Sequence, residues 1–423
     1  MKLGNNFKRD SGKALYMNFS DPLEMIILET SKSLVRNKTD GKGISELPGF
    51  ATYTPPFEEI EAIAKPFQKY KNVIVIGNGG SITSFKGYYQ ALFGKHSNDK
   101  QAFFVDTGEP DELNRIAQAA TPQDSVVIPI TKSGTNTQMT ESTLFFLNKR
   151  YPMLGVTSKQ SGAMREIFEK MQIPYLDHPS IGGRYSGFTP TGLLPAHLCG
   201  INIKEMFKGA EAMYKKCAPN SPLQENPALT ISTICAELDQ KGYDQIFMPV
   251  YSKKLEGFIT LFMQLLHESS GKNGKGQTLI GVGAPESQHH TNQRFFGGPQ
   301  NMIGLFVRVE EQDDYTTEIT VDDKLKNIPY RNGTLGALDG ISYADSHSFE
   351  YLGTSTDATN NKIPHMTLTV KKVDPYSVGE FVALWHYIAV YSSVLRGADP
   401  FDQPQVETAK DIAFAARNAK KGI

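Results

Sequence analysis

Short apolar runs that end at glycine or a small polar residue constrain the fold of this chain more than any other feature. The first half contains four such runs, at residues 72–76, 102–105, 125–130 and 153–156. The second half repeats the plan at residues 245–250, 279–283 and 303–309. Continuous apolar strands separated by helical segments are typical of parallel sheets with helices on both faces. The sequence therefore predicts an α/β protein with two doubly wound, mainly parallel sheets, whose ligands would lie at the carboxyl ends of the strands.

The chain length supports two domains. At 423 residues the chain is longer than one hydrophobic core ordinarily requires. The halves meet at residues 217–227, a polar stretch with three prolines that we interpret as a surface connection. The expected parts are an N-terminal segment at 1–45, a first domain at 46–215, a second domain at 228–395 and a C-terminal helix at 396–423.

Helical periodicity is clear at two further places. Within residues 254–270 apolar side chains recur at helical spacing, which predicts a helix with one apolar face. A second long helix is expected after Ser377, because Ser377 and Glu380 have the spacing of a capping box. Residues 311–376 are polar and carry no pattern that assigns them.

Charge and cysteine content exclude several classes of protein. Lys and Arg number 44 against 45 Asp and Glu, and no long basic run is present, so nucleic-acid binding is not expected. Three cysteines, Cys199, Cys217 and Cys235, without a CxxC spacing predict neither a disulfide framework nor a zinc site. No apolar stretch reaches transmembrane length, and the polar N-terminus lacks a signal core. We expect a cytoplasmic protein without membrane contact.

Two loops that follow predicted strands could bind a phosphate group. Residues 77–81, Gly-Asn-Gly-Gly-Ser, lack both the third glycine of a dinucleotide fingerprint and the Lys-Ser/Thr ending of a nucleotide P-loop. Residues 131–137 offer four hydroxyls, an amide and an ammonium group. Amides and hydroxyls at a strand–helix junction can hold an anion without high net charge. The alternative for residues 77–81 is a plain strand–helix turn. The alternative for residues 131–137 is a loop whose Ser and Thr side chains cap the following helix.

Three charged residues lie in short motifs. Glu268 is expected at the carboxyl end of its helix, where the helix dipole disfavours a carboxylate. Arg184 follows two glycines and could belong to a surface turn. Lys410 lies about two turns into a helix that Pro404 would begin. Glu268 and Lys410 could each also be an ordinary solvent-exposed side chain.

His289 and His290 suggest a metal site at first sight. Adjacent histidines point in divergent directions, however, and no third ligand follows nearby in the sequence. Metal binding is therefore the less favoured interpretation.

Together and in this order, the motifs resemble those of the phosphoglucose isomerase family, in its shorter bacterial and archaeal branch. The family's Gly-x-Gly-Gly-Ser and Gly-Gly-Arg-Tyr-Ser correspond to residues 77–81 and 182–186. Its Glu-Ser-Asn-Gly-Lys corresponds to residues 268–272, where Ser270 replaces asparagine. Its Phe-Asp-Gln-Pro-Gly-Val-Glu corresponds to residues 401–407, where Gln405 replaces glycine, and the family's lysine falls on Lys410.

The resemblance implies two sugar isomerase (SIS) domains and the reversible isomerisation of glucose 6-phosphate and fructose 6-phosphate in glycolysis and gluconeogenesis. It makes Glu268 the general base, places Arg184 beside the cis-enediolate, and gives ring opening to Lys410 and His289, with His290 as the alternative. The implied substrate-binding residues are Gly80, Ser81, Thr131, Lys132, Ser133, Asn136 and Gln403. A further contact threonine of the family has Met139 in its place.

The resemblance also implies an enzyme without a metal or other cofactor that works as a homodimer, in which His289 enters the neighbouring subunit's site. Two other functions stay open at this point. One is a dual phosphoglucose/phosphomannose isomerase, which would differ in the C2 epimer that its pocket admits. The other is a non-catalytic sugar-phosphate-binding regulator, which retention of the base, the histidine and the lysine disfavours.

Overall fold

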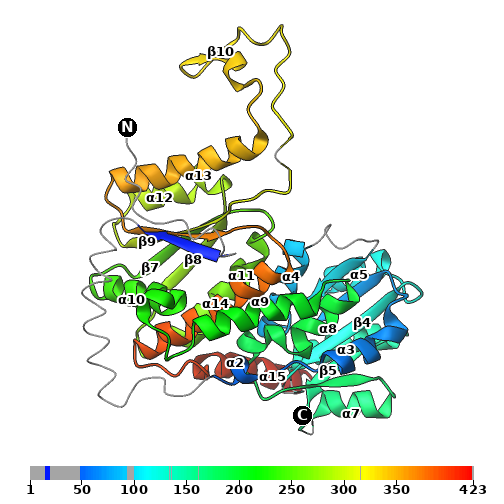
Figure 1. Cartoon of the computed structure of the whole chain (residues 1–423). Helices are drawn as coiled ribbons and strands as arrows, with labels where there is room; N and C mark the ends of the chain where they lie inside the picture. The colour runs from blue at the N-terminus through cyan, green and yellow to red at the C-terminus, as the bar shows by residue number, and fades with distance from the viewer. Residues whose placement is uncertain are drawn as a thin grey trace.

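The computed structural model describes residues 15–19, 48–92, 100–132, 134, 136–160, 162–314 and 316–421. In this part of the chain, two five-stranded sheets lie with helices between them and on their outer faces (Figure 1). The predicted α/β class with two mainly parallel sheets is confirmed. Among the described residues, no helix is both long enough and apolar enough to span a bilayer.

The first sheet is parallel throughout, in the order β3-β2-β4-β5-β6. Its strands are β2 (Asn72–Ile76), β3 (Gln101–Val105), β4 (Ser125–Thr131), β5 (Gly155–Ser158) and β6 (Tyr175–His178). Every residue of β2 and β4 is buried, which explains why both strands appear as continuous apolar runs. The run predicted at 153–156 forms β5 two residues later, and Met153 makes only an isolated bridge with Val127. The α-helices of this half as far as residue 198 are α2 (Gly49–Thr52), α3 (Phe57–Ala64), α4 (Thr83–Leu92), α5 (Pro110–Ala119), α6 (Thr137–Asn148), α7 (Ala163–Lys170) and α8 (Pro190–Leu198).

The second sheet has the order β1-β12-β9-β7-β8. Strands β7 (Gln245–Tyr251), β8 (Thr278–Gly283), β9 (Met302–Val309) and β12 (His365–Val370) are parallel, and β1 (Leu15–Phe19) pairs antiparallel with β12 at one edge. The three strands predicted in this half are confirmed. Strand β12 was not predicted, because threonines interrupt its apolar side chains and no continuous run results.

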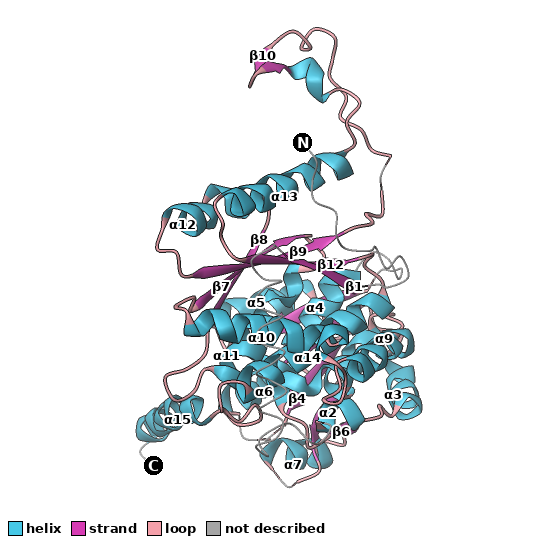
Figure 2. Ribbon diagram, turned by 60° about the vertical axis from the view of Figure 1, so that its left-hand side comes forward, coloured by secondary structure: helices cyan, strands magenta, loops and turns pink. Residues whose placement is uncertain are grey.

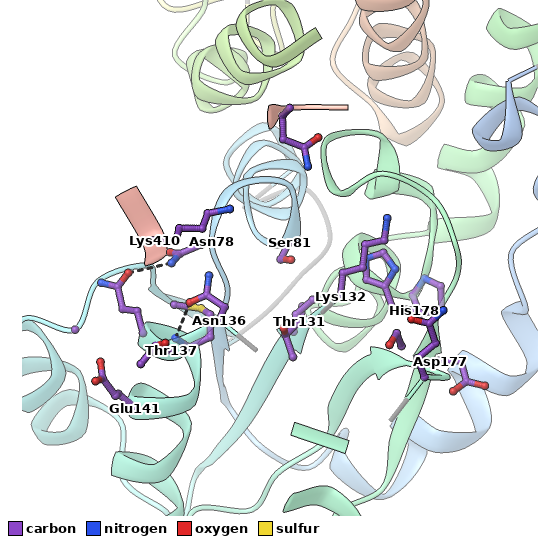
Figure 3. Close-up of a pocket in the computed structure, with 18 of the residues that line it drawn as sticks. Asn78, Ser81, Thr131, Lys132, Asn136, Thr137, Glu141, Asp177, His178 and Lys410 are labelled. Carbon is purple, nitrogen blue, oxygen red and sulfur yellow. Dashed lines mark hydrogen bonds between the residues drawn. The ribbon is translucent and has the colours of Figure 1, made fainter. Parts of the chain in front are cut away.

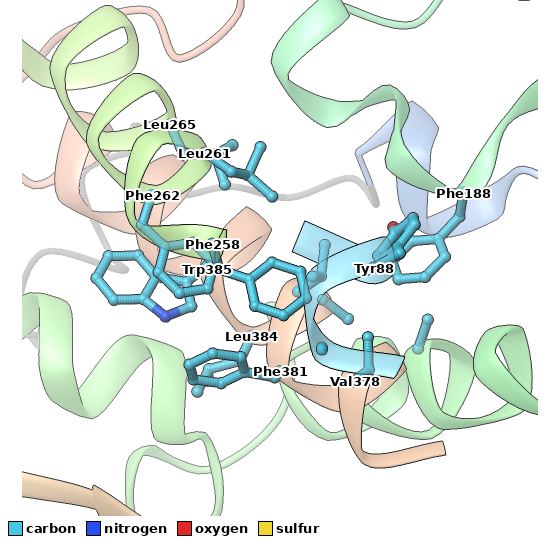
Figure 4. Packing of buried hydrophobic residues seen from close by; sticks show 14 of the residues in the cluster. Tyr88, Phe188, Phe258, Leu261, Phe262, Leu265, Val378, Phe381, Leu384 and Trp385 are labelled. Carbon is cyan, nitrogen blue, oxygen red and sulfur yellow. The ribbon is translucent and has the colours of Figure 1, made fainter. Parts of the chain in front are cut away.

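Helices α9 (Ile203–Lys216), α10 (Pro227–Gln240), α11 (Ile259–Ser270) and α14 (Pro375–Val394) lie between the two sheets (Figure 2). The rings of Trp385 in α14 and Phe262 in α11 stack at 4.2 Å between centroids, and Phe381 packs edge-on against Phe262 (Figure 4). One buried cluster contains side chains of both sheets, among them Val75 of β2 and Val250 of β7. The two sheets therefore share a hydrophobic core.

Glycines allow α9 and α14 to approach closely. A Cβ atom on Gly379 of α14 would lie 1.8 Å from the carbonyl oxygen of Met206, and one on Gly209 of α9 would lie 1.9 Å from that of Tyr376. No side chain fits at such distances, so the crossing of these helices depends on both glycines.

Two predicted helix boundaries are wrong. Helix α14 begins at Pro375 with Asp374 as its N-cap, and its capping box joins Asp374 to Ser377 rather than Ser377 to Glu380. Asp374 precedes a proline, which suits the first position of a helix, and this stronger start signal displaces Ser377 into the first turn. The helix predicted over 254–270 begins as a 3₁₀ turn, η5 (Glu256–Phe258), and is α-helical from Ile259.

Residues 311–376, unassigned from sequence, contain a projecting hairpin and a long helix. Helices α12 (Thr291–Gly297) and α13 (Tyr343–Asn360) cover the outer face of the second sheet, and the chain between β9 and α13 projects beyond α13 (Figure 1). We call residues 318–342 the arm. It carries the two-residue strands β10 (Pro329–Tyr330) and β11 (Gly333–Thr334). Hydrogen bonds between the backbones of Ile319 and Ile341 (2.8 Å) and of Gly340 and Ile319 (2.9 Å) close its base.

The predicted C-terminal helix begins at Pro404 as a 3₁₀ turn, η8 (Pro404–Val406), and continues as α15 (Glu407–Lys421). None of the described residues of α15 is buried. In Figures 1 and 2, α15 lies on the opposite side of the second sheet from α12 and α13.

Candidate active site

Two glycine-rich turns meet at the carboxyl end of β2. The first, η2 (Gly79–Ser81), leads into α4, and the second, η3 (Gly183–Phe188), follows β6. A Cβ atom on Gly80 would lie 2.0 Å from the carbonyl group of Gly183, so residue 80 must be glycine for the turns to pack. This contact fixes the position of Arg184.

Arg184 connects parts of the chain that are far apart in sequence. Its side chain is buried, and Nη1 donates hydrogen bonds to Glu268 Oε2 (2.8 Å) and to Gln403 Oε1 (2.9 Å). Nε donates to Ser269 Oγ (2.9 Å), while Nη2 donates to the carbonyl oxygen of Asp402 (2.7 Å). The hydrogen bonds of its planar guanidinium group thus fix Arg184, Glu268 and Gln403, three predicted site residues, relative to one another.

The Glu268 carboxylate is held from both sides. Its second oxygen, Oε1, accepts a hydrogen bond from Gln264 Nε2 (2.9 Å), and Gln264 Oε1 in turn accepts one from Thr83 Oγ1 (3.1 Å). The side chain retains 29 % of its exposure. An oriented carboxylate that still reaches solvent is suited to exchange a proton with a bound molecule.

The segment before α15 is anchored to the Glu268 motif. Lys272 is buried, forms an ion pair with Asp402 and donates a hydrogen bond to the carbonyl oxygen of Asp399. Tyr185 donates to the carbonyl oxygen of Pro400 (3.1 Å). These contacts determine where Gln403 and the start of α15 lie.

A cavity of about 1990 Å³ opens beside these groups. Six predicted site residues line it: Ser81, Thr131, Lys132, Asn136, Gln403 and Lys410 (Figure 3). Gln403, which accepts a hydrogen bond from Arg184, connects this cavity to Arg184 and Glu268. The structure therefore brings most of the predicted residues to one place.

The loop after β4 is ordered by its own polar groups. Thr131 Oγ1 accepts a hydrogen bond from the Gly134 amide (3.1 Å), and Asn136 caps α6 by accepting one from the Met139 amide (3.2 Å). Partial burial, together with the nearby Arg184, lowers the pKa of Lys132. Ser133, which was predicted to contact the phosphate, lies outside the described residues.

Lys410 and His289 occupy different surfaces. The Lys410 side chain is 59 % exposed at the edge of the cavity, where Nζ lies 2.7 Å from Glu407. His289 ends the 3₁₀ turn η6 (Glu286–His289) and is exposed, as is His290. This turn precedes α12, on the far side of the second sheet from α15 (Figures 1 and 2). The fold does not bring His289 to the cavity of its own chain.

Metal ligation has no support from the described residues, which contain no group of three His, Cys, Asp or Glu side chains able to hold an ion. His290 Nδ1 instead lies 2.6 Å from Thr291 Oγ1. The three cysteines are buried and free.

Several residues around the cavity were missed from the sequence. Gln264 lies four residues before Glu268, and this helical spacing could have identified it. His178 lines the cavity but is buried; its Nδ1 lies 2.7 Å from the Pro179 carbonyl oxygen, and burial lowers its pKa to about 4. His267, next to Glu268, accepts a hydrogen bond from the Leu279 amide (2.9 Å) and so faces β8.

Curated relatives resemble the chain over most of its length. It is 28 % identical over 363 residues to the glucose-6-phosphate isomerase of Methanocaldococcus jannaschii, a match that covers 83 % of this chain and 85 % of that protein. It is 27 % identical over 368 residues to the probable glucose-6-phosphate isomerase of Methanococcus maripaludis, covering 84 % and 80 % of the two chains.

Solved structures share the fold. A hypothetical protein from Thermus thermophilus superimposes with a TM-score of 0.81 at 21 % identity, covering 95 % of this chain and 99 % of that one. A glucose-6-phosphate isomerase from Chlamydia trachomatis gives a TM-score of 0.72 at 19 % identity, with 97 % and 89 % covered. The family model described as phosphoglucose isomerase matches residues 57–302, more than half of the chain. The chain therefore belongs to the phosphoglucose isomerase family.

Proposed function

We propose that this protein interconverts glucose 6-phosphate and fructose 6-phosphate through a cis-enediolate. The observation that carries the proposal is the Glu268 carboxylate, fixed by Arg184 and Gln264 beside a cavity whose walls can grip a phosphate. Isomerisation requires one base that moves a proton between C2 and C1 of the open-chain sugar, and an oriented carboxylate meets that need.

In this mechanism Glu268 removes the C2 proton and returns it to C1. Negative charge then develops on the oxygens of the enediolate. Arg184 is a fixed cation within hydrogen-bond distance of Glu268, and it would stabilise this charge without having to reorganise. Gln403, held by the same guanidinium group, would contact the sugar hydroxyls.

The phosphate would lie at the carboxyl ends of β2 and β4, near the first turns of α4 and α6. Ser81, Thr131, Lys132 and Asn136 line that part of the cavity, and Gly80 is buried just before Ser81, packed against Gly183. We include Ser133 in this group on the basis of the sequence alone. Helix N-termini and hydroxyls bind phosphate without many cations, in keeping with a formal net charge of −1.

Ring opening would use Lys410 of one chain and His289 of a second chain in a homodimer, with His290 as the alternative. The exposed position of His289, away from its own cavity, supports this assignment. The cavity of about 1990 Å³ is larger than typical small-ligand sites of roughly 300–1,000 Å³, which leaves room for a side chain from a neighbour. Because the three cysteines are buried thiols, we also expect the protein to work in a reducing cytoplasm.

A coupled assay tests the function directly. Conversion of fructose 6-phosphate to glucose 6-phosphate is followed through a glucose-6-phosphate dehydrogenase, and free fructose should be a very poor substrate. Repeating the assay with mannose 6-phosphate, coupled through its product, distinguishes a dual-specificity enzyme. Tight binding of fructose 6-phosphate without any turnover would instead identify a sugar-phosphate sensor.

A further inference from the structure

A ring of buried hydrogen bonds holds one edge of the Arg184 guanidinium group. Its Nε–H donates to Ser269 Oγ (2.9 Å), and its Nη2 donates to the Pro400 carbonyl oxygen (3.1 Å). The Tyr185 hydroxyl lies 2.9 Å from the same Ser269 Oγ and donates to the same Pro400 oxygen (3.1 Å). Two hydroxyl groups and one carbonyl group therefore connect Nε to Nη2.

The direction of each bond in this ring follows from the protons that are available. Guanidinium nitrogens only donate, so Ser269 Oγ accepts from Nε of Arg184. A phenol has one proton, and Tyr185 gives it to the Pro400 carbonyl oxygen, which can only accept. Ser269 must then donate its own proton to Tyr185 Oη, although the 2.9 Å distance by itself allows either direction. Each hydroxyl thus both donates and accepts one bond within the ring.

The ring is closed to solvent. Arg184, Tyr185 and Ser269 each retain at most 3 % of their exposure. A buried polar group that loses its partner is strongly disfavoured, so any rotation of the guanidinium plane would leave several groups unpaired at once. The ring therefore favours a single orientation of Arg184.

This orientation decides which nitrogen of Arg184 faces the proposed site. With Nε and Nη2 bound to the ring, Nη1 donates to Glu268 Oε2 (2.8 Å) and to Gln403 Oε1 (2.9 Å). Gln403 also lines the cavity, so Nη1 is the corner of the guanidinium group that is directed at a bound sugar. A cation stabilises developing charge best when it is oriented before the reaction begins.

From these contacts we propose that Ser269 and Tyr185 are positioning residues of the isomerase reaction. Together they hold the Nε and Nη2 edge of Arg184 so that Nη1 meets the negative charge of the enediolate. The proposal rests on the proposed function, which assigns Arg184 to that charge. It gives a role in the reaction to two buried hydroxyl groups that act only through Arg184.

Removing the Tyr185 hydroxyl tests this role while the packing is kept. Tyr185→Phe retains the ring, which stacks on Phe50 at 5.0 Å between centroids. We expect kcat with fructose 6-phosphate to fall roughly tenfold or more and KM to change little, because Arg184 acts on charge that develops in the transition state. Tyr151→Phe is the matched control. It also removes a buried hydroxyl that donates to a carbonyl oxygen, that of Ala120 (2.6 Å), and should leave both constants unchanged. Equal kcat values for the two variants would overturn the proposal.

Two inhibitors distinguish the orientation of Arg184 from a general loss of structure. A sugar-phosphate hydroxamate presents a planar, negatively charged group like that of the enediolate, whereas sorbitol 6-phosphate carries no charge at that end. In Tyr185→Phe the inhibition constant of the hydroxamate should rise roughly tenfold, and that of sorbitol 6-phosphate should change less than about twofold. A parallel rise of both constants would show that the site has deteriorated as a whole, and the positioning role would be rejected.

Ser269→Ala breaks the ring at a second point. If both hydroxyls act through the same ring, the double variant with Tyr185→Phe should have a kcat within about threefold of the slower single variant. Losses in kcat that multiply in the double variant would mean that the two side chains act independently, against the proposal.

Proton exchange at Arg184 tests the ring without reference to activity. The Nε–H resonance, identified by its absence from Arg184→Lys, should exchange with solvent at least about tenfold faster in Ser269→Ala than in wild type, because its acceptor is gone. Unchanged exchange would overturn the proposal. If wild-type protein does not isomerise fructose 6-phosphate, the proposed function fails, and this measurement still decides whether Ser269 holds Arg184. If wild-type protein is active and Tyr185→Phe behaves like Tyr151→Phe, the positioning role alone fails.

Discussion

At the residue scale, the site depends on how two side chains hold one carboxylate. Arg184 and Gln264 each donate a hydrogen bond to one oxygen of Glu268, so the carboxylate is held in one orientation. Conversion to an amide keeps this geometry nearly unchanged and removes the basic oxygen. The chemical role of Glu268 can therefore be separated from its structural role.

Glu268→Gln should lower kcat by at least about 10²-fold with a modest change in KM, because general base catalysis is lost while binding is retained. Steady-state kinetics with fructose 6-phosphate measure the effect. Glu256→Gln, at the start of the same helical segment, where the carboxylate forms an ion pair with Lys253 (2.7 Å), serves as the control and should behave like wild type. Near-native turnover by Glu268→Gln would remove this residue from the mechanism.

Arg184→Lys should be far from conservative. Lysine cannot reproduce the planar set of donors that reaches Glu268, Gln403 and the Asp402 carbonyl oxygen at once. We expect kcat/KM to fall by roughly 10²-fold or more, and amide exchange to accelerate over residues 399–403. Arg165→Lys, at a partly exposed ion pair of α7, provides the comparison and should leave both measurements unchanged. Unaltered exchange at 399–403 would show that Arg184 does not hold that segment.

At the scale of elements, the crossing of α9 and α14 carries the core that supports the site. Gly379→Ala would place a methyl group against the Met206 backbone and should destabilise the protein by about 1–3 kcal/mol or more, since backbone cannot move aside. Thermal or urea unfolding measures this. Gly353→Ala in α13, where the added methyl meets nothing within 4 Å, should be neutral or slightly stabilising. Equal midpoints for the two variants would contradict the close approach.

The first turns of α14 also contain a glutamate with altered titration. Burial, with a smaller contribution from Asp374, raises the pKa of Glu380 from 4.5 to about 7, although Lys216 opposes the shift. Within the described structure, Glu380 Oε2 has no hydrogen-bond partner. Because the folded-state pKa is the higher one, the protonated form favours folding. This contribution is complete below about pH 4.5 and is lost as the pH rises through about 7.

Glu380→Gln is neutral at every pH and should escape that loss. Its melting temperature relative to wild type should therefore rise between about pH 5 and about pH 8. Glu237→Gln, on the neighbouring helix α10, is the control for a general charge effect. A difference in melting temperature between Glu380→Gln and wild type that stays constant over this pH range would mean that Glu380 titrates as an ordinary surface carboxylate.

At the scale of the whole molecule, the division into SIS domains remains a proposal. The separate parallel sheets support domains at 46–215 and 228–395, whereas their common core and the packing of α9 on α14 make them one folded unit. Whether a second chain contributes a histidine to each active site is a separate question, and mixtures of inactive variants can answer it.

Mixtures of Glu268→Gln and His289→Ala chains should regain activity after subunit exchange. In a mixed dimer one site would carry both lesions and the other neither, so random exchange should restore roughly a quarter of wild-type activity. The same mixture with His290→Ala in place of His289→Ala decides which histidine acts. Each variant incubated alone is the control. If exchange is demonstrated and neither mixture recovers, the shared-site model fails.

The sequence by itself determined the central strands of both sheets and the family, but not β1, β6 or β12. Strands β2, β4, β7 and β9 are continuous apolar runs, and such runs encode buried parallel strands locally, without reference to the rest of the chain. Motifs around Gly80, Arg184 and Glu268 are equally local. Their order along the chain was enough to indicate a sugar-phosphate isomerase, and the family comparison confirmed it.

Only the tertiary structure decided how these pieces meet. Arg184 lies 84 positions from Glu268 and 219 from Gln403, and no local pattern encodes a contact over such separations. The same holds for Gly80, whose requirement for glycine comes from Gly183 rather than from its own backbone angles. Packing likewise decides where the arm lies and why His289 is away from its own cavity. Side-chain chemistry specifies local conformation, whereas burial of the shared core determines which surfaces remain exposed.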